Sequence, residues 1–205
     1  MEIILASQSP RRKKLLNMLD IRFRVISSGI DESTYQFSRK SPSEYTEQLA
    51  EIKAVDVSDK YPDALVIGGD TIVVLDGQII EKPESISQAV NILETLSGNT
   101  HQVYTGISIQ YKTRNIHHSF SDKTDVTFKK LNEGEIIYYI NNYEPFDKAG
   151  SYGIQDWSAM FVPRINGCFY NVVGFPVSKF CSELKKIGID KEIFEKHLNT
   201  KKETP

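Results

Sequence analysis

The stretch IILASQSPRRKKLL, residues 3–16, runs from an apolar segment through a short polar loop into a helix start. The apolar segment predicts a buried strand over residues 2–6. Ser9 has the side chain of a helix N-cap, and Pro10 suits the first helical position because proline has no N–H to leave unsatisfied. A strand that leads directly into a helix is the repeating unit of α/β folds, and we therefore expect that fold class.

The predicted helix begins with an unusual concentration of positive charge. Arg11 and Arg12 lie in its first turn and are followed by Lys13 and Lys14. A helix N-terminus is the positive end of the helix dipole, so cations there are unfavourable unless they share an anionic partner. Backbone N–H groups also point out of this end, Ser7 adds a hydroxyl, and arginine matches the oxygens of a phosphate. The stretch indicates a phosphate site, with a solvated basic helix end as the alternative.

Composition narrows the class of protein. The chain has 205 residues, 40% of them hydrophobic, and a net charge of −2, which favours neither a nucleic-acid partner nor an anionic membrane. No apolar stretch reaches the roughly 20 residues of a membrane span, and a strand rather than a signal peptide stands at the start. Cys168 and Cys181 match neither a metal site nor a disulfide framework. We expect a cytoplasmic protein with reduced thiols.

Strand and helix patterns alternate along the rest of the chain. Asp76-Gly77 predicts a tight hairpin, and Ser41-Pro42-Ser43-Glu44 predicts a capped helix start. We expect strands at 22–27, 64–67, 72–75, 78–80, 100–111, 117–128, 159–165 and 168–173, and helices at 10–19, 42–61, 86–98, 132–142 and 177–187. The inward face of the second helix is predicted to carry Tyr45, Leu49, Ile52 and Val55.

Asp70 follows a buried strand and two glycines, in the sequence Gly68-Gly69-Asp70-Thr71. Glycines let a ligand or another backbone approach closely, and a carboxylate at a strand end in a cleft is suited to bind a metal or act as a general base. A turn aspartate is the alternative, but a strand resumes directly afterwards. A bend or bulge in the strand therefore fits this stretch better than a surface turn.

Several other polar residues indicate a site only when they are considered together. Lys53 lies on or beside the inward face of its helix, and Lys82 ends the strand after the hairpin. Asp31-Glu32 alone is a surface acid pair, but together with Asp70 these carboxylates suit Mg²⁺ bound to phosphate oxygens. Gln155 lies in a glycine-containing loop from which its amide can read a base edge. The four histidines show no metal-ligand spacing, and we expect them to be surface or strand residues.

Taken together these motifs resemble the Maf family, a family of nucleoside triphosphate pyrophosphatases named for an effect on bacterial septum formation. The resemblance covers about residues 1–187 and rests on 7–12, 31–32, 53, 69–71, 81–83 and 150–155. It implies a bent mixed β-sheet flanked by helices, as in inosine triphosphate pyrophosphatases, with two lobes and a central cleft. It implies one domain over 1–188 and a homodimer. The stretch 189–205 departs from the family pattern, and we expect a peripheral helix and polar tail there.

The resemblance also implies an activity, the hydrolysis of a nucleoside triphosphate to the monophosphate and pyrophosphate. It assigns Asp70 as proton acceptor, Glu32 and Asp70 as ligands of Mg²⁺ or Mn²⁺, and four phosphate contacts: Ser7, Arg12, Lys53 and Lys82. Arg11, Thr71 and Gln155 resemble the branch that prefers dTTP and UTP rather than 7-methyl-GTP. Two alternatives stay open: a nucleotide-binding septation regulator without turnover, and a purine-preferring house-cleaning pyrophosphatase.

Overall fold

The computed structural model describes residues 1–35 and 41–198 and is built on one mixed β-sheet. Seven strands form it in the order β2-β1-β3-β5-β6-β7, with β4 also paired to β3. Their bounds are β1 (Glu2–Ala6), β2 (Arg24–Val25), β3 (Ala64–Leu75), β4 (Gln78–Ile80), β5 (Thr100–Tyr111), β6 (Ile116–Thr127) and β7 (Arg164–Asn166). Strand β1 pairs in parallel with β2 and β3, and the remaining pairs are antiparallel. The expected mixed α/β sheet is confirmed.

Helices flank the sheet, and their starts follow the predicted capping residues. Ser9 caps the first helix by accepting a hydrogen bond from the Arg12 N–H, and capping boxes at Ser41 and Asn132 start two others. The α-helices are α1 (Pro10–Asn17), α2 (Pro42–Lys60), α3 (Ile86–Leu96), α4 (Glu133–Tyr143), α5 (Phe169–Val173), α6 (Val177–Lys186) and α7 (Asp190–Leu198). Short 3-10 turns are η1 (Glu32–Thr34), η2 (Lys112–Arg114), η3 (Pro145–Asp147), η4 (Ala149–Ser151) and η5 (Trp157–Phe161).

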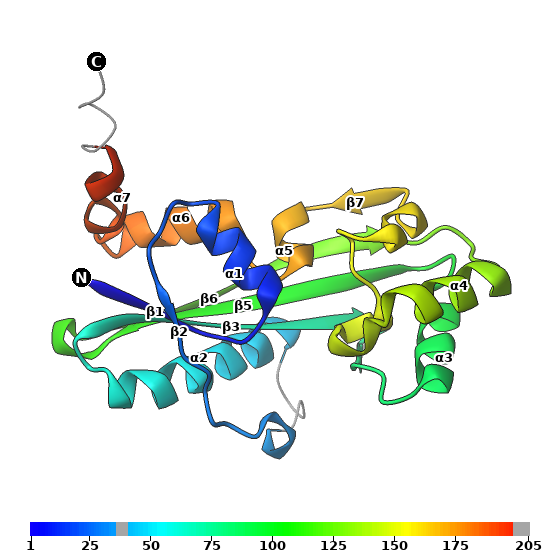
Figure 1. The fold of residues 1–205 in the computed structure, drawn as a ribbon, viewed down its shortest axis with the longest axis horizontal. Helices are drawn as coiled ribbons and strands as arrows, with labels where there is room; N and C mark the ends of the chain where they lie inside the picture. The colour runs from blue at the N-terminus through cyan, green and yellow to red at the C-terminus, as the bar shows by residue number, and fades with distance from the viewer. Residues whose placement is uncertain (36–40, 199–205) are drawn as a thin grey trace.

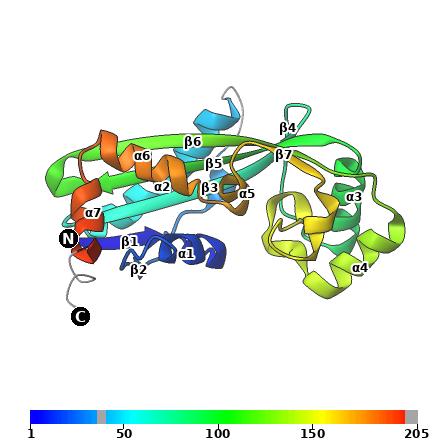
Figure 2. The same cartoon turned by 90° about the horizontal axis from the view of Figure 1, so that it is seen from above.

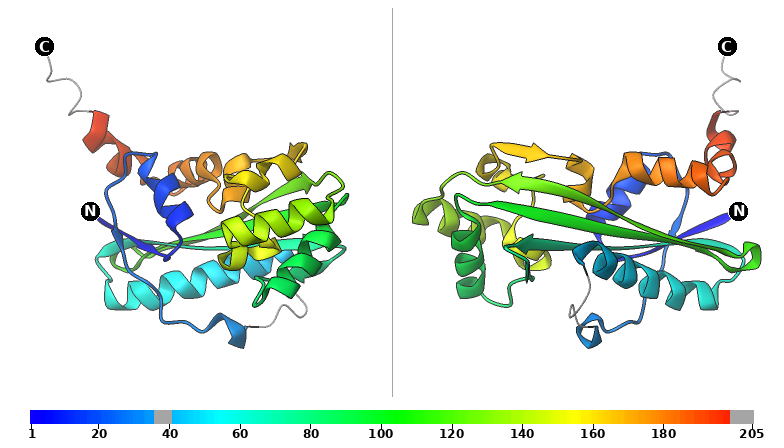
Figure 3. Two further views of the ribbon diagram at one scale, coloured as in Figure 1. Left: turned by 45° about the vertical axis from the view of Figure 1, so that its right-hand side comes forward. Right: turned by 180° about the vertical axis from the view of Figure 1, so that it is seen from behind.

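Three long strands, β3, β5 and β6, run the length of the molecule and connect two lobes (Figures 1 and 2). We name one end the α1 lobe; it holds β1, β2, α1, α2, α6 and α7. The other end, the α4 lobe, holds α3, α4 and the segment 145–161. Seen from behind, α2 lies along one face of the long strands and α6 along the opposite face (Figure 3). In the described part of the chain, no helix has the length and apolarity that a membrane crossing requires.

Helix α2 lies unusually close to the sheet because two glycines face it. A Cβ added at Gly68 would lie 2.3 Å from the Ala50 carbonyl oxygen, and one at Gly106 would lie 2.2 Å from that of Thr46. The buried face of α2 is correspondingly rich in small residues and differs from the predicted one: Thr46, Leu49, Ala50, Lys53, Ala54, Val57 and Ser58 are buried. Of the four residues expected to face inward, Leu49 is buried, whereas Tyr45, Ile52 and Val55 are half-buried.

We expect Gly68→Ala to lower the free energy of unfolding by about 1–3 kcal/mol, because the added methyl group forces α2 away from β3. Gly29→Ala is the matched control, since no atom lies within 4 Å of a Cβ built there. Its expected effect is below about 0.5 kcal/mol. Urea unfolding of the two variants measures the difference, and equal stability of both would contradict the close helix–strand contact.

The structure corrects several expected elements. Strand β3 is continuous through Gly69, and its pairing with β5 is uninterrupted from Val66 to Val74, so the predicted bend or bulge is wrong. Of the strand predicted at 159–165, residues 159–161 lie in η5 and only residues 164–165 lie in a strand, β7. The strand predicted at 168–173 is instead helix α5, because short apolar runs do not distinguish strand from helix. The strand expected at 22–27 is reduced to β2. Residues 199–205, the predicted polar tail, lie outside the described residues, and the division at residue 188 stays a prediction.

Candidate active site

A cavity of about 570 Å³ lies where the two lobes meet, beyond the end of β1. Its walls come from α1 and the loop before it, from η1 and α2, from the middle of β3, and from residues 147–156 of the α4 lobe. Every residue that the sequence singled out for a site lines this cavity: Ser7, Arg11, Arg12, Glu32, Lys53, Asp70, Thr71, Lys82 and Gln155. Positions that are far apart in the chain are therefore brought together as expected.

Part of one edge of β3 is not covered by another described strand, and side chains from both faces of the sheet reach the cavity around it. On the edge of β3 opposite β5, β1 pairs with residues 64–68 and β4 pairs with residues 73–75. Within the described ranges 1–35 and 41–198, no strand pairs with residues 69–72 on that edge. Because side chains alternate between faces, Asp70 emerges on the α2 side and Thr71 on the α1 side. Both reach the same space around the uncovered edge.

Lys53 joins the two predicted metal-binding carboxylates. Its ammonium lies 2.7 Å from Asp70 Oδ1 and 2.8 Å from Glu32 Oε1. Lys53 and Asp70 are both buried, whereas the Glu32 side chain is half exposed. The structure thus answers whether Lys53 reaches solvent or the cleft: it reaches the cleft and contacts both acids.

Glu32 and Asp70 fit a divalent cation that is shared with a ligand. Both carboxylates already converge on one positive group, Lys53 Nζ. Among the described residues no third acid, histidine or cysteine joins them in a metal-binding group. Mg²⁺ commonly takes one or two protein carboxylates and completes its coordination with water and phosphate oxygens. The pair therefore suits a phosphate-bridged ion better than a closed, all-protein metal site.

Arg12 lies across the floor of the cavity, and its hydrogen-bond partners among the residues that the structure describes are all neutral. Its guanidinium donates to Ser7 Oγ at 3.1 Å, to Thr71 Oγ1 at 2.9 Å and to the Gly174 carbonyl at 2.9 Å. Gly69 makes room for it, since a Cβ there would lie 3.1 Å from Arg12 Nε. Burial lowers the pKa of Arg12, and nearby Asp70 opposes that shift. Within the described residues, no carboxylate forms an ion pair with this guanidinium, so its charge is available to an anionic ligand.

The first turn of α1 offers fewer backbone donors than its position suggests. Pro10 has no N–H, the Arg12 N–H donates to Ser9 Oγ, and the Lys13 N–H donates to the Ser9 carbonyl. Ser7 contributes more: its oxygen accepts from the Ser9 N–H at 3.3 Å and from Arg12 at 3.1 Å. Since a hydroxyl oxygen has two lone pairs, both acceptor sites of Ser7 are filled and its proton is left to donate into the cavity.

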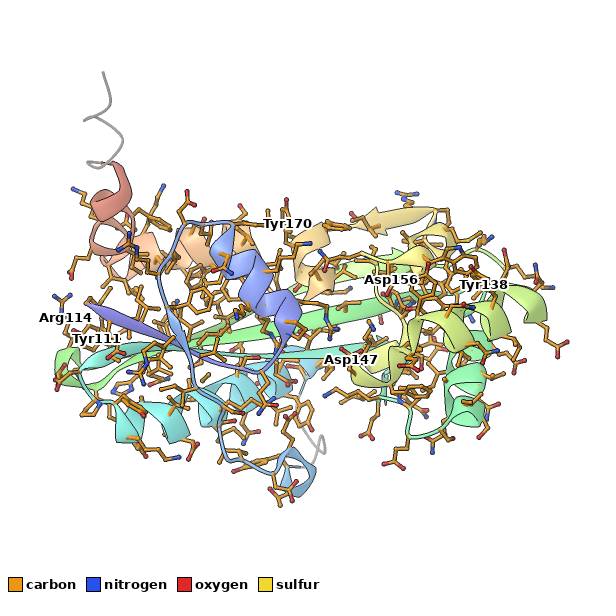
Figure 4. All side chains as sticks on the ribbon, viewed as in Figure 1. Tyr111, Arg114, Tyr138, Asp147, Asp156 and Tyr170 are labelled. Atoms are coloured by element: carbon orange, nitrogen blue, oxygen red, sulfur yellow. The ribbon has the colours of Figure 1, made fainter. Side chains whose placement is uncertain are left out.

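Arg11 contacts a partner that the sequence did not reveal. Its guanidinium donates to Asp147 Oδ2 at 2.6 Å and reaches the Asp147 carbonyl at 3.4 Å. Lys148 donates to the other carboxylate oxygen of Asp147 at 2.8 Å. Figure 4 shows Asp147 at the border between α1 and the α4 lobe. This ion pair joins the lobes at the cavity, and its members are 136 positions apart, so no local pattern connects them.

Lys82 and Gln155 line the cavity from the other sides and are exposed. Neither forms an ion pair or a side-chain hydrogen bond with the part of the chain that the structure describes. Lys82 is the second residue after β4, and Gln155 stands between Ile154 and Asp156. Both side chains are therefore free to contact a ligand, and their predicted roles as binding residues stay predictions.

The loop that carries Gln155 is held from beneath by His101. This histidine is a strand residue, as expected, but it is fully buried rather than on the surface. Its Nε2 lies 2.8 Å from the Tyr152 hydroxyl, and its ring meets those of Phe128 and Tyr152 edge to face. Burial lowers the pKa of His101 to about 4 and raises the pKa of Tyr152. His101 is consequently uncharged at neutral pH.

This burial predicts a specific loss of stability in mild acid. Below the ordinary histidine pKa of about 6.5 the unfolded chain binds a proton at His101, whereas the folded chain does so only near its folded pKa of about 4. The free energy of unfolding therefore falls between these pH values. From pH 7 to pH 4.5 we expect wild type to lose about 2 kcal/mol more than His101→Gln.

Urea unfolding at the two pH values measures this difference. His117→Gln, at an exposed position of β6, is the matched control and is expected to behave as wild type. A loss in His101→Gln as large as that of wild type would show that His101 is not the responsible group.

Comparisons with known proteins show the family to which the chain is similar. Residues 2–187 match the family described as Maf-like protein. The chain is 48% identical over 187 residues to a dTTP/UTP pyrophosphatase of Bacillus velezensis, covering 91% of this chain and 97% of that protein. It is 46% identical over 187 residues to a dTTP/UTP pyrophosphatase of a Geobacillus strain, covering 91% and 98%.

A solved structure of a HAM1 protein from Coxiella burnetii covers 91% of this chain and 99% of its own, with 14% identity and a TM-score of 0.48. That likeness is too remote to carry information on activity. The sequence match spans almost the whole chain and includes the cavity residues. The chain therefore belongs to the Maf family.

Proposed function

We propose that this protein is a nucleoside triphosphate pyrophosphatase that hydrolyses dTTP and UTP to the monophosphate and pyrophosphate. The observation that carries the proposal is Arg12, a guanidinium on the cavity floor whose hydrogen-bond partners in the described part of the chain are all neutral. It lies on the opposite side of the open β3 edge from Asp70. A polyphosphate supplies the negative charge that this cation lacks. Relatives at 48% and 46% identity are named for this activity.

The phosphates are proposed to lie against the start of α1. Arg12 binds them with its remaining N–H groups, and Ser7 donates its free hydroxyl proton to a phosphate oxygen. Lys82 contacts the same chain of phosphates from the end of β4. Charge-assisted hydrogen bonds of this kind are stronger than neutral ones, and they fix the α-phosphorus relative to Asp70.

Asp70 is proposed to act as the general base. It orients a water molecule and accepts its proton as the water oxygen attacks the α-phosphorus, and the bond to the oxygen bridging the α- and β-phosphates breaks. Lys53, 2.7 Å from Asp70 Oδ1, fixes the carboxylate and offers positive charge to the leaving pyrophosphate. A divalent ion, Mg²⁺ or Mn²⁺, held by Glu32 and Asp70, would supply further charge stabilisation when bound.

Three further properties belong to the same proposal. Arg11, Thr71 and Gln155 line the same cavity, and we assign them to substrate selection. We expect the protein to act in the cytoplasm on free nucleotides, with no nucleic-acid or membrane partner. We also expect a homodimer, which size-exclusion chromatography with light scattering tests.

A nucleotide panel tests the activity. Purified protein is incubated with dTTP, UTP, dCTP, dGTP and 7-methyl-GTP at equal concentration, with Mg²⁺, with Mn²⁺ and with a chelator, and the products are separated. We expect pyrophosphate and monophosphate from dTTP and UTP, dependent on metal. Release of no pyrophosphate from any nucleotide would favour the septation regulator, and faster turnover of the purine nucleotides would favour the purine-preferring enzyme.

A further inference from the structure

A chain of hydroxyl groups leads from the cavity floor into the interior of the sheet. Arg12 Nη2 donates to Thr71 Oγ1 at 2.9 Å, and Thr71 Oγ1 lies 2.9 Å from Thr105 Oγ1. Thr105 Oγ1 in turn donates to the Asn171 carbonyl at 2.9 Å. Thr71 and Thr105 are direct neighbours across β3 and β5, and Thr105 is fully buried. This series of hydrogen bonds ends at the Asn171 carbonyl, which belongs to the backbone of α5.

Counting protons along this chain gives each bond a direction. A carbonyl only accepts, so the single proton of Thr105 is used on Asn171. Thr105 therefore cannot donate to Thr71, and the Thr71 proton must point at Thr105. Arginine only donates, so Arg12 occupies one lone pair of Thr71. What Thr71 has left for a ligand is one lone pair and no proton.

Arg12 thus has hydroxyls of opposite character on its two sides. Ser7 has both lone pairs filled and offers a proton, which suits a phosphate oxygen. Thr71 has its proton engaged and offers a lone pair, which suits an N–H or O–H of the ligand. We propose that Thr105 is a positioning residue that makes Thr71 an obligatory hydrogen-bond acceptor, so that the cavity selects ligands with a donor at that point.

The inference rests on the proposed function for the identity of that donor. The nucleotides dTTP and UTP share two groups that can donate: the imide N–H of the base and the 3′-hydroxyl of the sugar. CTP replaces the imide N–H with an acceptor, and 3′-deoxy-UTP lacks the hydroxyl. Comparing UTP with each of these two analogues therefore separates the sources of the donor.

The experiment measures kcat/KM for UTP, CTP and 3′-deoxy-UTP in wild type and variants. Thr105→Val removes the acceptor of the Thr71 proton at nearly constant volume, and Thr105→Ser restores it. Thr100→Val is the matched control: Thr100 is also on β5 and also faces a threonine, Thr127, at 2.9 Å, but it is exposed and lies outside the cavity. Circular dichroism reports whether each variant is folded.

In wild type we expect UTP to be preferred over the analogue that lacks the donor. In Thr105→Val the Thr71 hydroxyl is free to rotate, and that preference falls about ten-fold, the typical worth of one hydrogen bond. Thr105→Ser and Thr100→Val are expected to keep the wild-type preference for UTP. A change in the UTP-to-CTP ratio identifies the imide, and a change in the UTP-to-3′-deoxy-UTP ratio identifies the sugar hydroxyl.

Thr71→Val provides a second route if Thr105→Val does not fold. Thr71 is only half-buried, and loss of its lone pair is expected to reduce the same ratio. Both ratios unchanged within two-fold in a folded Thr105→Val, or in Thr71→Val, would overturn the inference while leaving the proposed function intact. Wild-type protein that hydrolyses no nucleotide would instead refute the proposed function.

Discussion

Replacing Asp70 with asparagine is expected to lower kcat by about 10²–10⁴-fold, the usual contribution of a general base. Asparagine keeps the shape of the side chain but cannot accept the proton of the attacking water. Lys53 keeps its contact with Glu32, 2.8 Å away, so the cavity stays assembled and nucleotide affinity is largely retained. Steady-state kinetics with dTTP measure kcat, and equilibrium binding of a non-hydrolysable analogue measures affinity.

Two controls make this result specific. Asp76→Asn changes an aspartate in the turn after β3, outside the cavity, and is expected to leave kcat unchanged. Raising the Mg²⁺ concentration separates the two roles of Asp70, because a lost metal ligand is compensated by mass action and a lost base is not. Turnover of dTTP at the wild-type rate by Asp70→Asn would remove Asp70 from the chemistry.

Replacing Arg12 with alanine is expected to reduce kcat/KM by about 10–100-fold, chiefly through KM. The change removes the cation whose described hydrogen-bond partners are all neutral, together with three hydrogen bonds that hold Ser7, Thr71 and Gly174 around the cavity. A hydrogen bond to a charged group is worth about 1.5–3 kcal/mol, which sets this range. Arg12→Lys keeps the charge without the fork and is expected to recover part of the loss.

Lys13→Ala is the matched control for Arg12→Ala. Lys13 is the next residue on the same helical turn, but it is exposed and does not line the cavity. If the positive charge of the turn acted only through its general field, the two variants would behave alike. We expect Lys13→Ala to retain wild-type KM, and equal losses in both variants would contradict a specific site at Arg12.

Local patterns in the sequence predicted most of the framework. The caps at Ser9 and Ser41 correctly predicted where two helices begin, and Asp76-Gly77 correctly predicted the β3–β4 hairpin. The same patterns failed for the stretch 168–173, which is a helix that ends at Gly174 with φ 113°. A five-residue apolar segment carries too little periodicity to separate helix from strand.

The residues of the candidate site also include some that the sequence predicted and some that it did not. The motif around Asp70 and the cations of the first turn were found because their chemistry is unusual for their local context. Asp147, Thr105 and Asn171 were missed because each is ordinary locally and gains its role through contacts far along the chain. Gly68 and Gly69 were predicted to let a ligand or another backbone approach closely. At Gly68 the α2 backbone does so, whereas at Gly69 the approaching group is the Arg12 side chain.

A crystal structure with the α,β-imido analogue of dUTP tests most directly whether the cations beside α1 hold a polyphosphate. The account predicts phosphate oxygens within hydrogen-bond distance of Arg12 and the Ser7 hydroxyl, and the α-phosphorus facing Asp70. A nucleotide bound elsewhere, or bound with its phosphates pointing away from the start of α1, would contradict it.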